Sequence, residues 1–244
     1  MIKKALNLIK VTGVKGFMVL LQNKIKRLAF KQLYNTQEVE GLLEKLNKEL
    51  IEKNIKNIVI YPISASEIDS HKSSIFLEEQ QTTIIFVICG PQFFMKRSCS
   101  QESSLIYKIP MFAFMNSLDI LDQLNFEKGY FFLDTPKLCY TDMIDGLRNK
   151  GFYFYYHISN NGEAEKLYSK CRSEIEESLV LQADIVCTNS EEQFQFFKQL
   201  RKDIVLFPNH TKTVGQTVGI YNLKEVVQLM NSQKNTTFFC ELYR

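Results

Sequence analysis

The alternation of hydrophobic and polar stretches between residues 152 and 209 predicts a β-α-β-α-β passage. Its first element is an aromatic run that follows Gly151 and precedes a polar segment, as expected of a strand buried on both faces. The later stretches alternate between apolar side chains at helical spacing and short β-prone runs. The expected elements are a central parallel strand over 152–157, a helix over 163–181, a strand over 183–187, a helix ending near Arg201, and a strand over 203–207.

The same pattern extends the predicted sheet toward the N-terminus. β-branched and aromatic runs predict further strands, and amphipathic stretches between them predict helices. The polar stretch 64–81 is expected to be a connecting helix or loop, and the polar stretch 98–104 a loop. The expected strands are 58–63, 82–89 and 129–133, and the expected helices are 36–53, 116–124 and 141–150. The chain is therefore predicted to be an α/β protein with a Rossmann-like parallel sheet flanked by helices, its body spanning residues 36–210.

Residues 1–35 differ from this body because basic and apolar residues alternate there. Residues 1–31 carry eight Lys or Arg and no acidic residue. A basic amphipathic segment is typical of a helix that lies on an anionic membrane surface. A helical extension packed on a partner, or on its own domain, explains the pattern equally well. Nucleic-acid binding is disfavoured, because no recognised binding motif accompanies the charge.

The composition is that of a globular chain. At 244 residues, with 45% hydrophobic and 23% charged residues, it can bury a substantial core. Its six cysteines form no CxxC pair, which favours buried, reduced thiols. No apolar stretch reaches the length of a membrane span, and no signal-peptide pattern begins the chain. We expect a cytoplasmic protein, held peripherally on the inner face of the plasma membrane by residues 1–31.

Candidate site residues follow the ends of the predicted strands. Ligands of open parallel sheets bind beyond the carboxyl ends of the strands. There, His157 could hydrogen-bond a sugar hydroxyl or help to neutralise phosphate, and Asp134 could orient an acceptor hydroxyl. A strand-end histidine satisfied by the backbone and an ordinary Asp-Thr-Pro turn remain alternatives. The catalytic candidates are His157 and Asp134, and the substrate-binding candidates are Thr135, Ser159 and Asn209.

Other chemistries find less support in the sequence. Glu191 and Glu192 are adjacent in a predicted helix, so their side chains diverge, and both suit the positive N-terminus of that helix. His71 and His210 have no partner at metal-ligand spacing, so no metal site is predicted. The glycines at 215 and 219 do not complete a nucleotide-binding fingerprint, and no cofactor is expected.

The order of elements in the 152–209 passage resembles a known family. An aromatic strand ending in His157, then Ala-Asp followed by hydrophobic residues and Ser-Glu-Glu, then a helix and a strand ending in Pro-Asn, is similar to the close of the N-terminal domain of GT-B glycosyltransferases. The nearest subgroup is family four, the retaining enzymes of bacterial surface polysaccharides. One departure is His210, where the family usually has Gly. The residues that carry the resemblance are Ala183, Asp184, Ser190, Glu191, Glu192, Pro208 and Asn209.

The resemblance implies retaining hexosyl transfer from a nucleotide sugar to a glycan or lipid-linked acceptor. In such enzymes a second domain binds the donor through two glutamates separated by seven residues. Residues 211–244, expected to be a linker and the start of that domain, contain only Glu225 and Glu241. The chain is therefore expected to be a truncated transferase, or a half-enzyme completed by a donor-binding partner subunit. The competing interpretation is a non-catalytic, Rossmann-like scaffold that docks a partner or a membrane.

Overall fold

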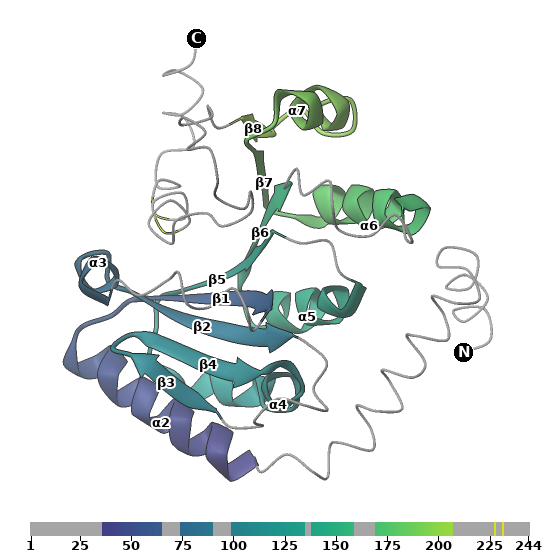
Figure 1. The fold of residues 1–244 in the computed structure, drawn as a ribbon. Helices are drawn as coiled ribbons and strands as arrows, with labels where there is room; N and C mark the ends of the chain where they lie inside the picture. Colours follow the sequence, from purple (N-terminus) through teal and green to yellow (C-terminus); the bar gives the residue numbers. More distant parts are fainter. Residues whose placement is uncertain are drawn as a thin grey trace, which may run out of the picture.

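The computed structural model describes residues 36–64, 74–89, 99–134, 138–158 and 169–206, together with residues 227 and 231. Within these residues eight strands form one twisted sheet in the order β3-β4-β2-β1-β5-β6-β7-β8 (Figure 1). Every neighbouring pair is parallel except β3 and β4. The strands are β1 (Asn57–Ser64), β2 (Thr82–Cys89), β3 (Ser100–Ser103), β4 (Ile106–Pro110), β5 (Lys128–Leu133), β6 (Tyr153–Ile158), β7 (Ile185–Thr188) and β8 (Val205–Leu206).

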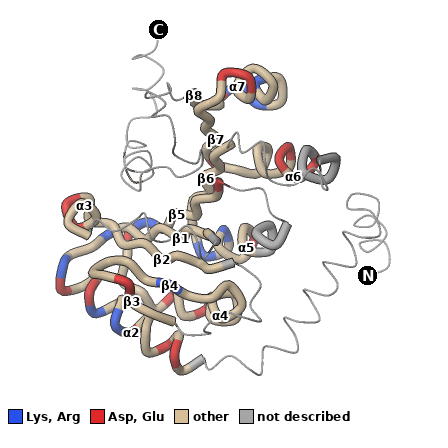
Figure 2. Tube along the Cα trace, in the orientation of Figure 1, with Lys and Arg blue, Asp and Glu red and all other residues tan. Residues whose placement is uncertain are grey.

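Helices connect the parallel strands, as the alternation of patterns predicts. Figure 2 shows that charged residues gather mainly on these helices and on connecting segments, whereas the central strands carry few of them. The helices are α2 (Thr36–Glu52), α3 (Ser74–Glu79), α4 (Met111–Asn116), the 3-10 helix η2 (Leu118–Gln123), α5 (Leu138–Arg148), α6 (Ser169–Gln182) and α7 (Glu191–Phe197). The predicted α/β class, with a mostly parallel sheet flanked by helices, is confirmed. The aromatic run also forms an interior strand, β6, as expected.

Two local predictions were wrong. The stretch 98–104, expected to be a loop, contains β3, a polar strand at the edge of the sheet whose middle residues are exposed. An edge strand with polar side chains produces no hydrophobic periodicity, so the pattern could not reveal it. The helix predicted to end near Arg201, α7, ends at Phe197 instead. Arg201 instead donates hydrogen bonds from its guanidinium to the carbonyls of Val180, Ala183 and Asp184.

The sheet has two faces of different character. Because side chains alternate along a strand and the register aligns neighbouring strands, the members of each face can be assigned from the pairing. We call one the aromatic face, formed by Tyr61, Phe86, Tyr130, Phe132 and Tyr155. The other is the helical face, formed by Ile60, Val87, Phe131, Phe154 and Tyr156.

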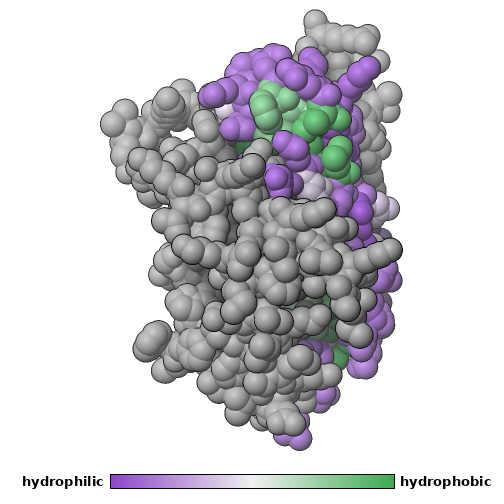
Figure 3. All heavy atoms as spheres, turned by 90° about the vertical axis from the view of Figure 1, so that its right-hand side faces the viewer, coloured by the Kyte–Doolittle hydropathy of each residue, from purple (hydrophilic) through white to green (hydrophobic). Residues whose placement is uncertain are grey.

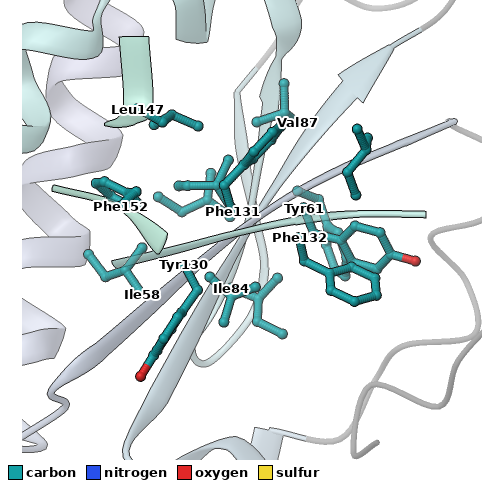
Figure 4. Close-up of a cluster of buried hydrophobic side chains, with 14 of the residues drawn as sticks. Ile58, Tyr61, Ile84, Val87, Tyr130, Phe131, Phe132, Leu147 and Phe152 are labelled. Carbon is teal, nitrogen blue, oxygen red and sulfur yellow. The ribbon is translucent and has the colours of Figure 1, made fainter. Parts of the chain in front are cut away.

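Most of the described helices lie on the helical face. Tyr156 donates a hydrogen bond to Glu176 of α6 at 3.4 Å, and Tyr107 of β4, on the same face, donates to Glu49 of α2. Figure 4 shows Leu147 of α5 on the side of Val87 and Phe131, with Tyr61 and Phe132 on the opposite side. The helical face is therefore closed by layers of helix, as is typical of parallel sheets.

The aromatic face carries α3, because its connection from β1 to β2 runs across the sheet in the direction opposite to the connections through α5, α6 and α7 and so crosses on the other side. Asn231 donates a hydrogen bond from Nδ2 to Oε1 of Gln80, just past α3, at 3.1 Å. Val227 is 1% exposed and belongs to the same hydrophobic core. These two residues are therefore tied to the body of the fold, while the predicted boundary near residue 210 stays a prediction.

None of the helices in the described part of the chain is long and apolar enough to cross a membrane. The basic segment 1–35 lies outside the described residues, as do residues 207–244 apart from Val227 and Asn231. Membrane attachment through residues 1–31 therefore stays a prediction.

Candidate functional site

The two predicted catalytic candidates meet at the carboxyl end of the sheet. Asp134 directly follows β5, and His157 is the penultimate residue of β6. Leu133 pairs with Tyr156, so the next step of the parallel register brings Asp134 beside His157. Both belong to the alternating set that forms the aromatic face. The fold thus places these two residues at neighbouring positions on one face of the sheet.

Asp134 is held in place by a tyrosine from the neighbouring strand. The hydroxyl of Tyr61, in β1, donates a hydrogen bond to Oδ2 of Asp134 at 2.6 Å. Both side chains are buried, with Asp134 9% and Tyr61 2% exposed. A carboxyl group in such surroundings needs hydrogen-bond partners to offset its lost hydration. The Tyr61 hydroxyl supplies one and fixes the orientation of the carboxyl group.

His157 is only 1% exposed. Burial lowers the pKa of its imidazole to about 3, because the charged form loses its hydration. The imidazole is therefore neutral at physiological pH, with one nitrogen able to donate a hydrogen bond and the other able to accept one. This state suits binding of a hydroxyl group. It does not favour the other role considered for His157, neutralising phosphate.

The described strands around this group carry little positive charge. In β1, β5, β6 and β7 the only Lys or Arg is Lys128. It begins β5, whereas Asp134 follows the last residue of that strand, so the two lie at opposite ends of β5. Anion sites normally use Lys, Arg or clustered backbone N–H groups. A carboxyl group, a neutral imidazole and aromatic side chains instead match a neutral ligand rich in hydroxyl groups.

Two tyrosines of this face were not among the predicted site residues. Tyr61 was missed because its role depends on β1 lying beside β5, which no local pattern reveals. Tyr155 is fully buried, and its hydroxyl has no hydrogen-bond partner. A signal for Tyr155 was present in the sequence, since it lies two residues before His157 in a predicted strand and therefore on the same face.

Three predicted substrate-binding residues, Thr135, Ser159 and Asn209, lie outside the described residues, so their placement stays a prediction. No group of three or more His, Cys, Asp or Glu side chains that could hold a metal ion occurs within the described ranges. Cys99 and Cys187 are free thiols, and burial raises the pKa of each.

The described residues that carry the glycosyltransferase resemblance have structural roles. Asp184 accepts a hydrogen bond from the backbone N–H of Phe154 at 2.7 Å and forms an ion pair with Arg148 at 3.2 Å. Ser190 is the N-cap of α7, and its hydroxyl accepts from the backbone N–H of Gln193 at 3.3 Å. Glu191 and Glu192 occupy the first turn of α7, as the capping interpretation expects.

The Asp184 contacts fasten the segment before β7 to β6 and α5, and Ser190 caps α7, which explains why such a motif closes a β-α-β-α-β passage. They do not identify a substrate. No protein-family model matches this chain, and no curated protein sequence matches it.

Proposed function

We propose that this chain is the acceptor-side domain of a glycosyltransferase-like protein, which binds a neutral, hydroxyl-rich acceptor at the carboxyl end of its sheet. The observation that supports this most is that the Tyr61-held Asp134 and the neutral, buried His157 lie on neighbouring strands and on the same face of the sheet. The site lies where parallel sheets bind ligands. The resemblance to the N-terminal domain of family-four enzymes adds the reaction, retaining transfer from a nucleotide sugar in surface-polysaccharide synthesis.

In this proposal the two side chains divide the work of holding the acceptor. The Asp134 carboxyl group accepts a hydrogen bond from the reacting hydroxyl and orients it, while the His157 imidazole hydrogen-bonds a second hydroxyl. The leaving diphosphate needs cationic or dipolar groups, which these strands do not supply. A donor-binding domain or partner subunit would contribute them. Alone, the chain is expected to bind acceptor and to be weak or inactive in transfer.

Acceptor binding tests the proposal with the chain itself. We would measure binding of methyl glycosides of glucose, galactose, mannose and N-acetylglucosamine to the full chain by ligand-observed NMR. His157→Ala and Asp134→Asn should each weaken binding by about tenfold, the effect of about 1.4 kcal/mol. Glu191→Gln is a matched control, because it removes an exposed carboxylate on α7, away from the aromatic face.

The folded state of each variant would be checked by circular dichroism. Binding that is equal in wild type, His157→Ala and Asp134→Asn would remove these residues from the site. Absence of binding for every glycoside in the wild type would overturn the acceptor-binding proposal itself.

Membrane association is a separate part of the proposal. Deleting residues 1–31 should release the protein from phosphatidylglycerol vesicles, since each Lys or Arg near the surface contributes about 1 kcal/mol. The release should be mimicked for the full chain by high salt. Vesicle binding that persists after the deletion would show that another part of the chain contacts the membrane.

A second candidate function, a non-catalytic scaffold, is favoured by a different surface. Leu181, Phe196 and Leu200, at the ends of α6 and α7, are 63%, 54% and 43% exposed. Figure 3 shows an apolar patch among hydrophilic residues on the side of the molecule that carries α6 and α7. Exposed apolar patches mark protein contacts. This function predicts that Phe196→Glu disrupts complex formation with a partner protein while glycosides have no effect on it.

A further inference from the structure

The hydroxyl of Tyr155 is the unexplained polar group of the aromatic face. Tyr155 is 0% exposed, and its hydroxyl oxygen is buried with no hydrogen-bond partner. Such a group costs about 1–3 kcal/mol relative to one that is hydrogen-bonded. Native proteins leave few of these groups, and each one calls for an explanation.

The described residues around Tyr155 do not provide a hydrogen-bond partner for its hydroxyl. Its ring stands edge-on to that of Tyr130, with centroids 5.8 Å apart, and its strand neighbours are Phe132 and Ile185. Cys187, on the same face of the next strand, already donates its thiol to the carbonyl of Tyr156 at 3.8 Å. The titratable groups that act electrostatically on the Tyr155 hydroxyl are Tyr130, Cys187, Asp184 and Tyr153, and none of them is its hydrogen-bond partner.

The position of Tyr155 relates it to the candidate site. Tyr155 and His157 are two residues apart in β6, so their side chains project from the same face about 6.6 Å apart. Tyr61 stands edge-on to Phe132, at 5.0 Å between centroids, and Phe132 pairs with Tyr155. Tyr155, His157 and Asp134 therefore lie on one face of the sheet, among aromatic rings.

We propose that Tyr155 is a further binding residue of this site, whose hydroxyl hydrogen-bonds a hydroxyl or ring oxygen of a neutral polyhydroxylated ligand. The inference rests on the proposed function, because it assigns the same acceptor a third polar anchor. It explains why a fully buried strand residue carries a hydroxyl that the ligand-free protein leaves without a partner. Tyr155→Phe removes this hydroxyl and retains the ring.

The substitution should change binding and stability in opposite directions. In the full chain, Tyr155→Phe should weaken binding of the methyl glycosides about three- to tenfold, the loss of one hydrogen bond. Without ligand its unfolding midpoint in urea should equal or exceed that of the wild type, because an unsatisfied group is gone. Tyr130→Phe is the matched control, since it removes a hydroxyl from a buried tyrosine of the same face and should leave binding unchanged.

Each outcome decides between the proposals. If the wild type binds glycosides, His157→Ala loses binding and Tyr155→Phe keeps it, the Tyr155 inference is overturned and the proposed function stands. A lower unfolding midpoint for ligand-free Tyr155→Phe would show that the hydroxyl already has a partner, and would also overturn the inference. If the wild type binds none of the glycosides, both proposals fall.

Discussion

The two faces of the sheet bury their side chains to a similar extent, but the buried side chains differ in chemical type. On the helical face, Phe131 and Phe154 are 1% and 0% exposed, and their tilted rings lie 5.4 Å apart between centroids. On the aromatic face, Tyr61, Tyr155 and His157 are equally buried, yet each brings a polar group into the interior. The helical face also buries the hydroxyls of Tyr107 and Tyr156, but these are paired with Glu49 and Glu176, whereas on the aromatic face the hydroxyl of Tyr155 has no hydrogen-bond partner.

We propose that this difference separates stability from ligand binding within one sheet. A protein that needed only a core would fill both faces with apolar side chains, because buried polar groups reduce stability unless they are well paired. Two polar residues of the aromatic face, Asp134 and His157, lie at the carboxyl ends of β5 and β6, where ligands of parallel sheets bind. We therefore expect substitutions on the helical face to act on folding, and polar deletions on the aromatic face to act on binding.

The largest expected effect is on the helical face. Phe131→Ala should lower the free energy of unfolding by about 3–5 kcal/mol, because it removes a fully buried ring and leaves a cavity beside Phe154. Urea unfolding followed by circular dichroism measures this loss. Tyr153→Ala, in the neighbouring strand, is the control, since Tyr153 is 51% exposed and its loss should cost less than about 1 kcal/mol. Equal losses would contradict the assignment of Phe131 to a tightly packed core.

The sequence could predict those parts of the fold whose side chains are buried. Strands β1, β2, β5 and β6 are continuous apolar or aromatic runs, so the hydrophobic pattern located them closely. Strand β3 escaped because its residues are polar and its partner lies across a turn at the sheet edge. The local hydrophobic pattern indicates which residues are buried, so it cannot reveal an edge strand whose side chains are exposed.

The candidate site was predictable only in part. Asp134 and His157 could be proposed from the sequence because the end of a buried strand is visible in the local pattern, and ligands of parallel sheets bind beyond such ends. The bond between Tyr61 and Asp134 joins residues 73 positions apart and exists because β1 is inserted between β2 and β5. The order of the strands depends on how the whole chain packs. The contact therefore cannot be predicted from the sequence of either segment alone.

An intermediate effect is expected for that contact. Tyr61→Phe should destabilise the ligand-free protein by about 1–3 kcal/mol, because the Asp134 carboxyl group loses a buried hydrogen bond. The same substitution at Tyr155 should cost nothing, since its hydroxyl has no hydrogen-bond partner to lose. Comparing urea midpoints of the two variants tests this directly. Equal losses of stability in the two variants would contradict the conclusion that the Tyr61 hydroxyl has a stabilising hydrogen bond and the Tyr155 hydroxyl has none.

The smallest expected effect is a pH dependence carried by His157. Its pKa of about 3 in the folded state lies below the value of about 6.5 for an exposed histidine, so the unfolded chain binds a proton between these values that the folded chain does not. Stability should therefore fall as the pH is lowered through about 6.5, by about 1 kcal/mol between pH 7 and pH 5.5. His157→Gln should flatten this part of the curve, whatever its effect on absolute stability.

The measurement is the free energy of unfolding in urea at half-unit steps from pH 7.5 to pH 5. Titrating neighbours on the same face, Asp134 and Cys187, are present in both proteins, so the difference between the two curves isolates the imidazole. A slope that is the same in wild type and His157→Gln would mean that the imidazole is hydrated in solution. The site would then be open to water and able to carry positive charge, which would restore phosphate as a ligand and weaken the case for a neutral acceptor.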